Sequence, residues 1–441
     1  MELVVVGGLA ATSIYFRLTI EKRKKSKIKN SWKELMQELK LSTKDSKAIP
    51  EVKEVEFIEN GFILTVKIPT GLELKKIEDT KEAIENKFEG LVSIYKERFS
   101  SSVQIKIITK DIGKFIYHPV KTESFELYIG KTFDSNNYLI DVNRFTHILV
   151  GGVNGTGKSF LISTILTNLI YNSSKEIEIH LGQIVKGDLG VFKNCRPVKF
   201  ASEDLKEISE DLEKVVKLID LRSKHFAQFG IKNLNHYNKH FQGEKAKRIF
   251  YVIEELSFFM PSSSDNEEVK YLKGKCWDNI LAIVKAGRSS GIHLIALIQR
   301  STVSNLPSDV KSQMCRISFR QISSIDSKNI IECDDAINLD DRECLIYGTN
   351  KPMDIVKTPF VDEDFKALNQ YVKEIITPNS SITKTDLNRL ESLLDNLEEE
   401  KVEELQQEEV VEESNVKKNK KVIYQKPNKT PKKGMIKVDD I

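Results

Sequence analysis

The chain has 441 residues, which is too long for one ordinary hydrophobic core, so we expect two folded parts and additional tails. Its 68 basic and 65 acidic residues leave a net charge of only +3, so the overall charge does not select a class of partner. The five cysteines lack any CxxC spacing, which excludes a disulfide framework and a cysteine zinc site and indicates reduced thiols in a cytosol. These cysteines are Cys195, Cys276, Cys315, Cys333 and Cys344.

Residues 1–20 are predicted to form a transmembrane helix. From Leu3 to Ile20 the chain is apolar or small, and Arg17 is the only charged residue. A helix of this length spans about 27 Å, which crosses the hydrocarbon core if the Arg17 side chain extends to the interface. The alternative is a buried strand and helix that pack on the soluble part of the protein.

Residues 21–50 are predicted to form a basic juxtamembrane linker. The lysine-rich cluster Glu21–Lys27 follows the apolar segment, so the positive-inside rule places the rest of the chain in the cytoplasm. The same charges suit an anionic lipid surface. A cleaved signal peptide is disfavoured because its charges would precede the apolar run. The sequence therefore predicts a single-pass protein of the cell membrane.

Residues 51–119 are predicted to form a small α+β domain. Asn60-Gly61 lies between two apolar runs, and this arrangement is the strongest short sequence signal for a hairpin. The expected elements are strands at Val55–Ile58, Phe62–Ile68 and Val103–Ile108 and a helix at about Lys75–Phe99.

Residues 120–377 are predicted to form a larger α/β domain. Short apolar runs alternate here with amphipathic helices, which is typical of a parallel sheet covered by helices on both faces. The expected strands are His147–Val150, Ile177–Leu181, Ile249–Ile253, Leu294–Ile298 and Arg316–Phe319.

Residues 378–441 are predicted to form a charged tail, disordered or partly helical. Residues 385–413 are acidic with leucines at helical spacing, and residues 416–437 are rich in lysine. A solvated, mobile tail is one interpretation. An oligomerisation helix followed by a basic arm that touches DNA is the other.

A phosphate-binding loop is the most specific motif of the chain. The pattern GxxxxGK[ST] runs from Gly152 to Ser159, after a buried apolar run and before a helical segment. Glycines let backbone N–H groups approach phosphate oxygens, and the helix N-terminus adds partial positive charge. We therefore predict a site for ATP and Mg²⁺, in which Lys158 contacts the β- and γ-phosphates and the Ser159 hydroxyl joins the magnesium shell. The predicted nucleotide-binding residues are Gly151, Gly152, Val153, Asn154, Gly155, Thr156, Gly157, Lys158, Ser159 and Phe160.

Two adjacent carboxylates end a second apolar run. Hydrolysis requires one acid for magnesium and one for the attacking water, and Glu254 and Glu255 occupy these two positions. Aspartate is usual at the magnesium position, so the longer side chain of Glu254 is a departure. Two glutamates at a strand end are also compatible with a solvated surface.

A third apolar run ends in Gln299, which could sense the γ-phosphate or align water. Ring-shaped motors also need an arginine from the neighbouring subunit, because charge develops on the transferring phosphoryl group. The candidates are Arg288 and Arg316, with Arg300 and Arg320 as further ones. Each of these arginines could instead have a scaffold role.

Other polar residues carry weaker predictions. His236 and His240 have helical spacing but lack an evident third ligand, so no metal is expected there. A basic region lies between the motifs, and its side chains would either follow DNA phosphates in a ring pore or simply solvate helices. It comprises Lys214, Lys217, Arg222, Lys224, Lys232, Lys239, Lys245, Lys247 and Arg248.

Several spaced motifs, in order, resemble the motor domain of the FtsK/SpoIIIE family over about residues 120–362, and residues 50–110 are more weakly similar to the small domain that precedes that motor. The motifs are the phosphate loop, Lys186-Gly187-Asp188, the stretch Leu218–Asn238, the strand Tyr251–Glu255, the run Ala286–Arg300, Arg316–Phe319 and Ser324–Ser327.

This resemblance implies a RecA-like P-loop NTPase fold and a membrane-anchored, homohexameric ATPase that translocates double-stranded DNA. The single-span layout is similar to coupling proteins of conjugative elements, whose partners are a relaxase–DNA complex and secretion-channel proteins. The chain lacks a multi-span N-terminal region and a C-terminal winged helix, which disfavours chromosome segregation. Chromosome or plasmid partitioning, protein export by a type VII-like system and a non-hydrolysing scaffold remain alternatives.

Overall fold

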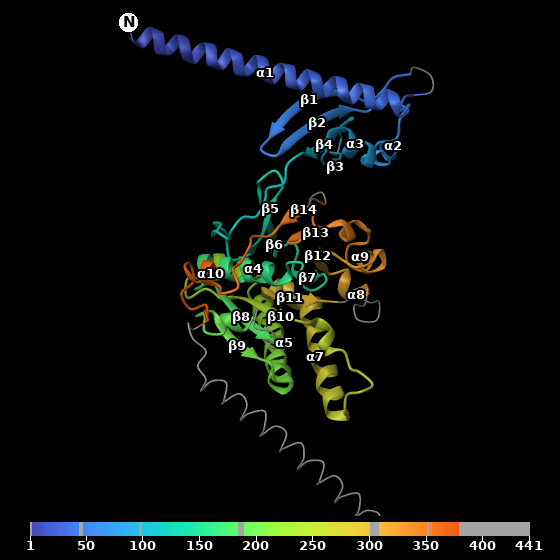
Figure 1. Cartoon of the computed structure of the whole chain (residues 1–441). Helices are drawn as coiled ribbons and strands as arrows, with labels where there is room; N and C mark the ends of the chain where they lie inside the picture. The colour runs from blue at the N-terminus through green and yellow to red at the C-terminus, as the bar shows by residue number, and fades with distance from the viewer. Residues whose placement is uncertain are drawn as a thin grey trace, which may run out of the picture. The chain divides into compact units, whose positions relative to one another are not determined.

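The computed structural model describes residues 2–43, 47–96, 99–183, 189–299, 308–350, 353 and 355–378, with side chains omitted for residues 2–18, 308 and 309. The chain divides into two units, Met1–Thr377 and Pro378–Ile441. Every helix and strand of the described part belongs to the first unit (Figure 1). The predicted charged tail lies outside the described residues apart from Pro378.

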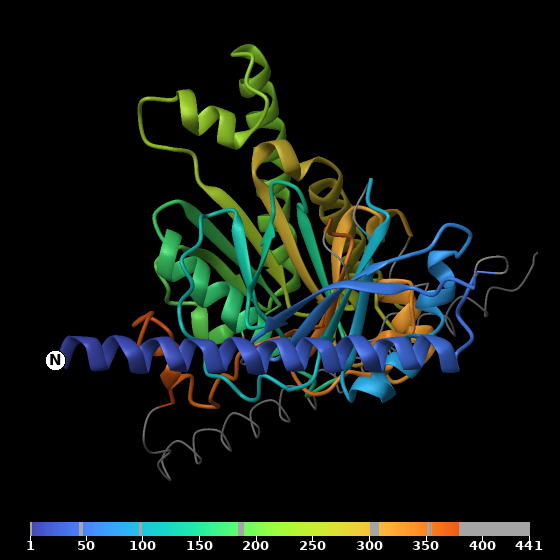
Figure 2. The ribbon, with the colours of Figure 1, turned by 90° about the horizontal axis from the view of Figure 1, so that it is seen from above.

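The chain begins with one helix, α1 (Glu2–Glu38), drawn in dark blue in Figure 2. The predicted transmembrane segment, residues 1–20, falls almost entirely on residues whose side chains lie outside the described part. Among the described residues, no helix combines the length and the apolar character needed to cross a bilayer. The transmembrane segment stays a prediction.

The segment 21–50 differs from the predicted linker, because α1 continues to Glu38 and its last turns pack on the small domain. Trp32 is 1% exposed and donates its indole N–H to the Pro50 carbonyl at 2.9 Å. Leu35 and Met36 are also buried. These three side chains share one helix face through i, i+3 and i+4 spacing, a stripe too short to stand out in a lysine-rich segment.

The small domain is a four-stranded antiparallel sheet with the strand order β1-β2-β4-β3. The predicted hairpin is confirmed, because Ile58 pairs with Gly61 across the turn. The elements are β1 (Glu51–Ile58), β2 (Gly61–Lys67), α2 (Leu74–Glu78), α3 (Lys81–Phe88), β3 (Leu91–Tyr95) and β4 (Ser102–Ile108).

The predicted single helix over Lys75–Phe99 is wrong. Helix α3 ends at Phe88, where Glu89 adopts a left-handed conformation with φ 51°. Gly90 then passes so close to β4 that a Cβ atom would lie 2.4 Å from the Ile108 carbonyl oxygen. The following Leu91–Tyr95 pairs with β4 as a strand, so tertiary pairing overrides the helical pattern.

The larger domain contains a ten-stranded sheet with the order β6-β5-β14-β13-β12-β7-β11-β10-β8-β9 (Figure 1). All five predicted strands are confirmed as β7, β8, β10, β11 and β12, and they are parallel neighbours. The sheet is mixed where a parallel one was expected, because β13, β14, β5 and β6 add antiparallel pairs at one side. The strands are β5 (Glu126–Thr132), β6 (Asn137–Asp141), β7 (His147–Gly151), β8 (Ile177–Gly182), β9 (Val198–Ser202), β10 (Arg248–Ile253), β11 (Ile292–Ile298), β12 (Met314–Ser318), β13 (Glu343–Tyr347) and β14 (Ile355–Lys357).

Two hydrophobic cores cover the two faces of this sheet. Successive strand residues point to opposite faces, so Val150 packs in the core that contains Leu161 of α4, whereas Leu149 packs in the core that contains Ile280 of α7. The larger helices are α4 (Lys158–Ser173), α5 (Leu205–Gln228), α7 (Glu267–Ser290) and α9 (Ser324–Ile331), and the shorter ones are α6 (Leu234–His240), α8 (Ser308–Lys311) and α10 (Lys366–Asn369).

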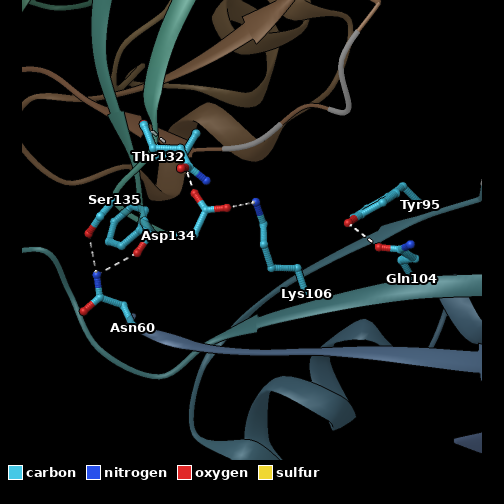
Figure 3. A network of polar contacts seen from close by, with 9 residues as sticks. Asn60, Tyr95, Gln104, Lys106, Thr132, Asp134 and Ser135 are labelled. Atoms are coloured by element: carbon cyan, nitrogen blue, oxygen red, sulfur yellow. Dashed lines mark hydrogen bonds and ion pairs between the residues drawn. The ribbon is translucent and has the colours of Figure 1, made fainter. Parts of the chain in front are cut away.

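Polar side chains of the small domain contact the turn between β5 and β6 (Figure 3). The Asn60 amide donates to the Phe133 carbonyl at 2.8 Å and to the Ser135 hydroxyl at 3.3 Å. The Lys106 ammonium lies 3.5 Å from the Asp134 carboxylate. These contacts tie the small sheet to the first strands of the larger domain.

A charged histidine is buried between the sheet and α5. His180 of β8 bonds the Asp211 carboxylate of α5 at 2.7 Å and the Glu178 carboxylate at 3.2 Å, and its ring stacks on Tyr251. Burial opposes the positive charge, but the hydrogen bonds to Asp211 and Glu178 outweigh burial and raise the pKa of His180 to about 9. The protonated imidazole therefore holds two carboxylates at neutral pH.

We expect His180→Gln to destabilise the protein in a pH-dependent way. The pKa of His180 is higher in the folded state than its ordinary value of 6.5, so its stabilisation is complete below pH 6.5 and is lost as the pH rises through 9. The free energies of unfolding of wild type and variant, measured by thermal melting, should differ by about 3 kcal/mol at acidic pH and converge above pH 9. An equal difference at both ends of this range would contradict the charged network.

Candidate functional site

Three adjacent parallel strands deliver the predicted site residues to one edge of the sheet. Strand β11 pairs with β7 on one side and with β10 on the other. The phosphate loop follows β7, Gln299 follows β11 and Glu254 follows β10. Because parallel strands have their carboxyl ends at the same edge, these segments meet there.

A cavity of about 370 Å³ lies at this edge, a size typical of sites for small ligands. It combines loop residues, a carboxylate and an amide, and the apolar Ile162, Leu189 and Leu297 were not predicted. The predicted residues that line it are Asn154, Gly155, Gly157, Lys158, Ser159, Phe160, Glu254 and Gln299. The predicted Gly151, Gly152, Val153 and Thr156 are not among the lining residues, and Gly151 is the last residue of β7.

The loop backbone depends on glycine at two positions beside the cavity. Gly155 has φ 78° and open space where a Cβ would point. Gly157, with φ 124°, is the N-cap of α4, and a Cβ there would lie 2.9 Å from the Arg342 Cα. Side chains rarely adopt these φ values, so glycine permits the loop to turn into the first turn of the helix.

Side-chain hydrogen bonds hold the loop in shape. The Lys158 ammonium donates to the carbonyls of Gly152 at 2.5 Å and Val153 at 2.9 Å. The Thr156 hydroxyl also donates to the Val153 carbonyl, at 2.8 Å. The cation of Lys158 therefore lies within the loop that it closes, at the wall of the cavity.

Backbone groups from outside the motif support the loop. The Val153 N–H donates to the Arg320 carbonyl at 3.1 Å, and the Arg342 N–H donates to the Thr156 carbonyl at 2.8 Å. Arg342 is 5% exposed, has φ 67° and donates from its guanidinium to the Thr358 carbonyl. Sequence reasoning missed Arg342, and its surroundings contain no local pattern that indicates this role.

The two adjacent glutamates occupy different positions. Glu254 lines the cavity and is 7% exposed. Glu255 is outside the lining: its carboxylate accepts hydrogen bonds from the Ser257 hydroxyl at 2.5 Å and from the Gln299 N–H at 3.0 Å. Glu255 thereby ties the end of β10 to the end of β11. Its predicted role toward water stays a prediction.

Gln183 is a further residue that the sequence analysis missed. Its side-chain oxygen accepts the Glu255 N–H at 3.0 Å, and its own N–H donates to the Ser202 carbonyl at 2.8 Å. The backbone of Gln183 is left-handed, with φ 62°. A polar residue directly after a buried parallel strand is a signal that could have identified it.

The candidate arginines that the structure describes, Arg288, Arg316 and Arg320, are not among the residues that line the cavity. Arg288 is exposed and donates to the Asn143 carbonyl at 3.2 Å. Arg316 is 5% exposed, bonds Glu332 at 2.7 Å and lies over the Tyr347 ring. Arg320 pairs with Asp341 at 3.0 Å, and Arg300 lies outside the described residues. Any action of these arginines across a subunit boundary stays a prediction.

The lining residues suit a magnesium nucleotide. Hydroxyl and carboxylate oxygens, here from Ser159 and Glu254, are ligands that Mg²⁺ prefers, and Mg²⁺ commonly uses only one or two protein groups besides phosphates. Within the described part of the chain, no group of three or more His, Cys, Asp or Glu residues could hold a metal ion by itself. His236 and His240 pack ring against ring, 4.7 Å apart.

Known proteins are similar to this chain over part of its length. Over 286 residues, 63% of this chain, it is 26% identical to the DNA translocase FtsK of Caldanaerobacter subterraneus subsp. tengcongensis. It is also 26% identical, over 276 residues and 60% of this chain, to the DNA translocase SftA of Bacillus subtilis. The matched regions cover only 38% and 28% of those two proteins.

A solved structure described as the pCW3 conjugation coupling protein TcpA, in a monomer form with ATPγS, has a similar fold. The TM-score is 0.56 at 20% identity, and the match covers 79% of this chain and 99% of that chain. The family model of FtsK/SpoIIIE matches residues 118–295, which contain the phosphate loop, both glutamates and most of β11. Residues 118–295 are therefore a domain of the FtsK/SpoIIIE family of P-loop ATPases.

Proposed function

We propose that the protein hydrolyses ATP and uses the energy to move DNA. The observation that carries this proposal is the shared cavity, where the phosphate loop, a carboxylate and an amide converge from three parallel strands. Phosphate oxygens would accept hydrogen bonds from the loop N–H groups and from the Lys158 ammonium. Such a set of fixed donors can stabilise charge that develops during phosphoryl transfer.

Each carboxylate has a distinct part in this proposal. Ser159 and Glu254 would hold Mg²⁺, which supplies charge neutralisation on the phosphates when bound. Glu255 would orient the attacking water and accept its proton. The bond from the Gln299 N–H to Glu255 would then fix the base relative to the amide side chain of Gln299, which lines the cavity.

DNA is the proposed cargo because the two bacterial relatives are both named DNA translocases. A homohexameric ring would enclose the DNA, and an arginine of one subunit would reach the nucleotide of its neighbour. Double-stranded DNA is the form that we expect.

Delivery of DNA during conjugative or mobile-element transfer is the proposed setting. It is supported by the fold shared with a conjugation coupling protein over nearly all of that chain. The apolar segment 1–20 and the lysine cluster after it favour an anchor in the cell membrane, with the motor in the cytoplasm. A relaxase–DNA complex and secretion-channel proteins are the partners that such a role requires. Partitioning of chromosomes or plasmids would use the same motor without that channel.

Duplex DNA should raise the ATPase rate of the wild-type protein. The Glu255→Gln variant should still bind ATP, but its rate of ATP hydrolysis should fall by about a hundredfold or more. The measurement is phosphate release with and without duplex and single-stranded DNA, beside binding of a fluorescent ATP analogue. A rate indifferent to either DNA would indicate another cargo, such as an exported protein. Unchanged turnover in Glu255→Gln would remove that residue from catalysis.

Gly157→Ala should weaken binding of magnesium nucleotide by about tenfold or more. The new Cβ would meet Arg342 at 2.9 Å in a conformation with φ 124°, so the loop must shift. Gly274→Ala is the matched control, because nothing lies within 4 Å of its added Cβ and alanine favours the interior of α7. Equal affinity of the two variants would contradict the proposed cradle.

Full-length protein should sediment with membranes and resist carbonate extraction, whereas a chain that starts at Glu21 should be released. This start keeps Trp32, Leu35 and Met36, which pack on the small sheet. ATP binding by the shortened chain is the control for folding. Carbonate release of the full-length chain would exclude a membrane-spanning segment.

A further inference from the structure

A second polar pocket lies at the opposite end of the strands that carry the nucleotide cavity. Its volume is about 490 Å³. Arg248 is the first residue of β10, Asn143 precedes β7, and Ser289 lies in the last turn of α7 just before β11. Glu254 follows the other end of β10, so the two sites are separated by the length of that strand.

The pocket is basic and contains no opposing charge. Its cationic lining residues are Lys232, Arg248, Lys285 and Arg288. No aspartate or glutamate lines it, and none of these cations forms an ion pair with another residue in the described part of the chain. The remaining lining residues are Asn143, Ser223, Asn233, Leu234, Asn235, Ala286 and Ser289.

Arg248 at this pocket is almost fully buried, with 3% of its surface exposed. One terminal nitrogen donates to the His293 ring at 2.6 Å, and the other donates to the amide oxygens of Asn143 at 3.1 Å and Asn235 at 2.7 Å. Its Nε is buried and has no acceptor among the described residues.

All partners of Arg248 are neutral. The second ring nitrogen of His293 lies 2.9 Å from the Thr146 carbonyl, so it carries the proton and the first nitrogen accepts from Arg248. Burial and the nearby Arg248 hold the pKa of His293 well below its usual value. Arg316, another buried arginine, does have a carboxylate partner in Glu332. Among the described residues no carboxylate bonds Arg248 directly, and Asp141 and Glu176 act on its charge only from a greater distance.

A buried guanidinium without a directly bonded counter-ion is costly, and an anion in the pocket beside it would offset that cost. Arginine with surrounding lysines and amide side chains is suited to phosphate oxygens. The lining contains no aromatic side chain on which a base could stack. The chemistry therefore favours a phosphate group over a nucleobase.

We propose that this pocket, with Arg248 at its base and Lys232, Lys285 and Arg288 around it, binds a phosphate group independently of the nucleotide cavity. The phosphate belongs either to a DNA backbone or to a free phosphate compound. The DNA source rests on the proposed function, and the free source does not. The pocket also distinguishes Lys232 and Arg248 from the other lysines and arginines of the basic region between the motifs.

The test compares two full-length double variants with the same loss of charge. Lys232→Gln/Lys285→Gln removes two exposed cations of the pocket, and Lys214→Gln/Lys224→Gln removes two exposed cations of α5 outside its lining. Binding of a labelled DNA duplex is measured by fluorescence anisotropy over a series of salt concentrations. Thermal melting of both variants checks that the exposed substitutions leave the fold intact.

The pocket variant should bind duplex about tenfold more weakly than the control variant, and the slope of log affinity against log salt should fall by about two. A second arm measures pyrophosphate binding by calorimetry with Lys158→Ala added to every variant, which weakens the other phosphate site. Loss of pyrophosphate binding in the pocket variant with unchanged duplex binding would assign a free phosphate compound to the site.

Two results would overturn the proposal. One is that the pocket variant and the control variant both bind each probe as tightly as the wild-type protein. The other is that both variants lose the same amount of affinity, which would indicate diffuse positive charge without a site. If the wild-type protein fails to bind duplex at all, the proposed DNA cargo is wrong, and the pyrophosphate arm alone decides whether the pocket binds phosphate.

Discussion

Parallel pairing of β7, β11 and β10 is the constraint on which the site depends. It brings the phosphate loop, Glu254 and Gln299 to one edge, although nearly 150 residues separate the start of the loop from Gln299. Hydrogen bonds across the strand ends then fix their relative positions, from the Gln299 N–H to Glu255 and from the Glu255 N–H to Gln183. A change in the length or register of β11 would separate the loop from the carboxylates.

The same strands link two ends of different chemistry. Strand β10 is buried along its whole length, begins with Arg248 beside the basic pocket and ends before Glu254 in the nucleotide cavity. A short, fully buried strand behaves as a rigid rod, because close-packed interiors yield little to strain. A motor that converts nucleotide hydrolysis into movement of a polyanion would benefit from such a rigid connection between its nucleotide and phosphate sites.

The parallel strands were predictable because strands buried on both faces appear as continuous apolar runs, as in Ile249–Ile253. The phosphate-loop motif is also local in the sequence, so it predicted the loop residues that line the cavity. The pair of adjacent acids in turn predicted Glu254, which lines the cavity as well. The antiparallel pairing of β14 with β5 and the bond from the Arg342 N–H to Thr156 join segments that are distant in the sequence, which leave no local pattern. The prediction of a helix over Lys75–Phe99 was wrong because Gly90 packs against β4, and this tertiary contact also leaves no local pattern.

Calorimetric titration with ATPγS, in the presence of Mg²⁺ and again with the ion chelated, tests the central claim most directly. The cavity formed by the loop, Ser159 and Glu254 predicts one nucleotide per chain, with affinity that falls steeply when Mg²⁺ is removed. Binding of the same strength without the ion would contradict the assignment of Ser159 and Glu254. No binding under either condition would contradict the whole account of the motor.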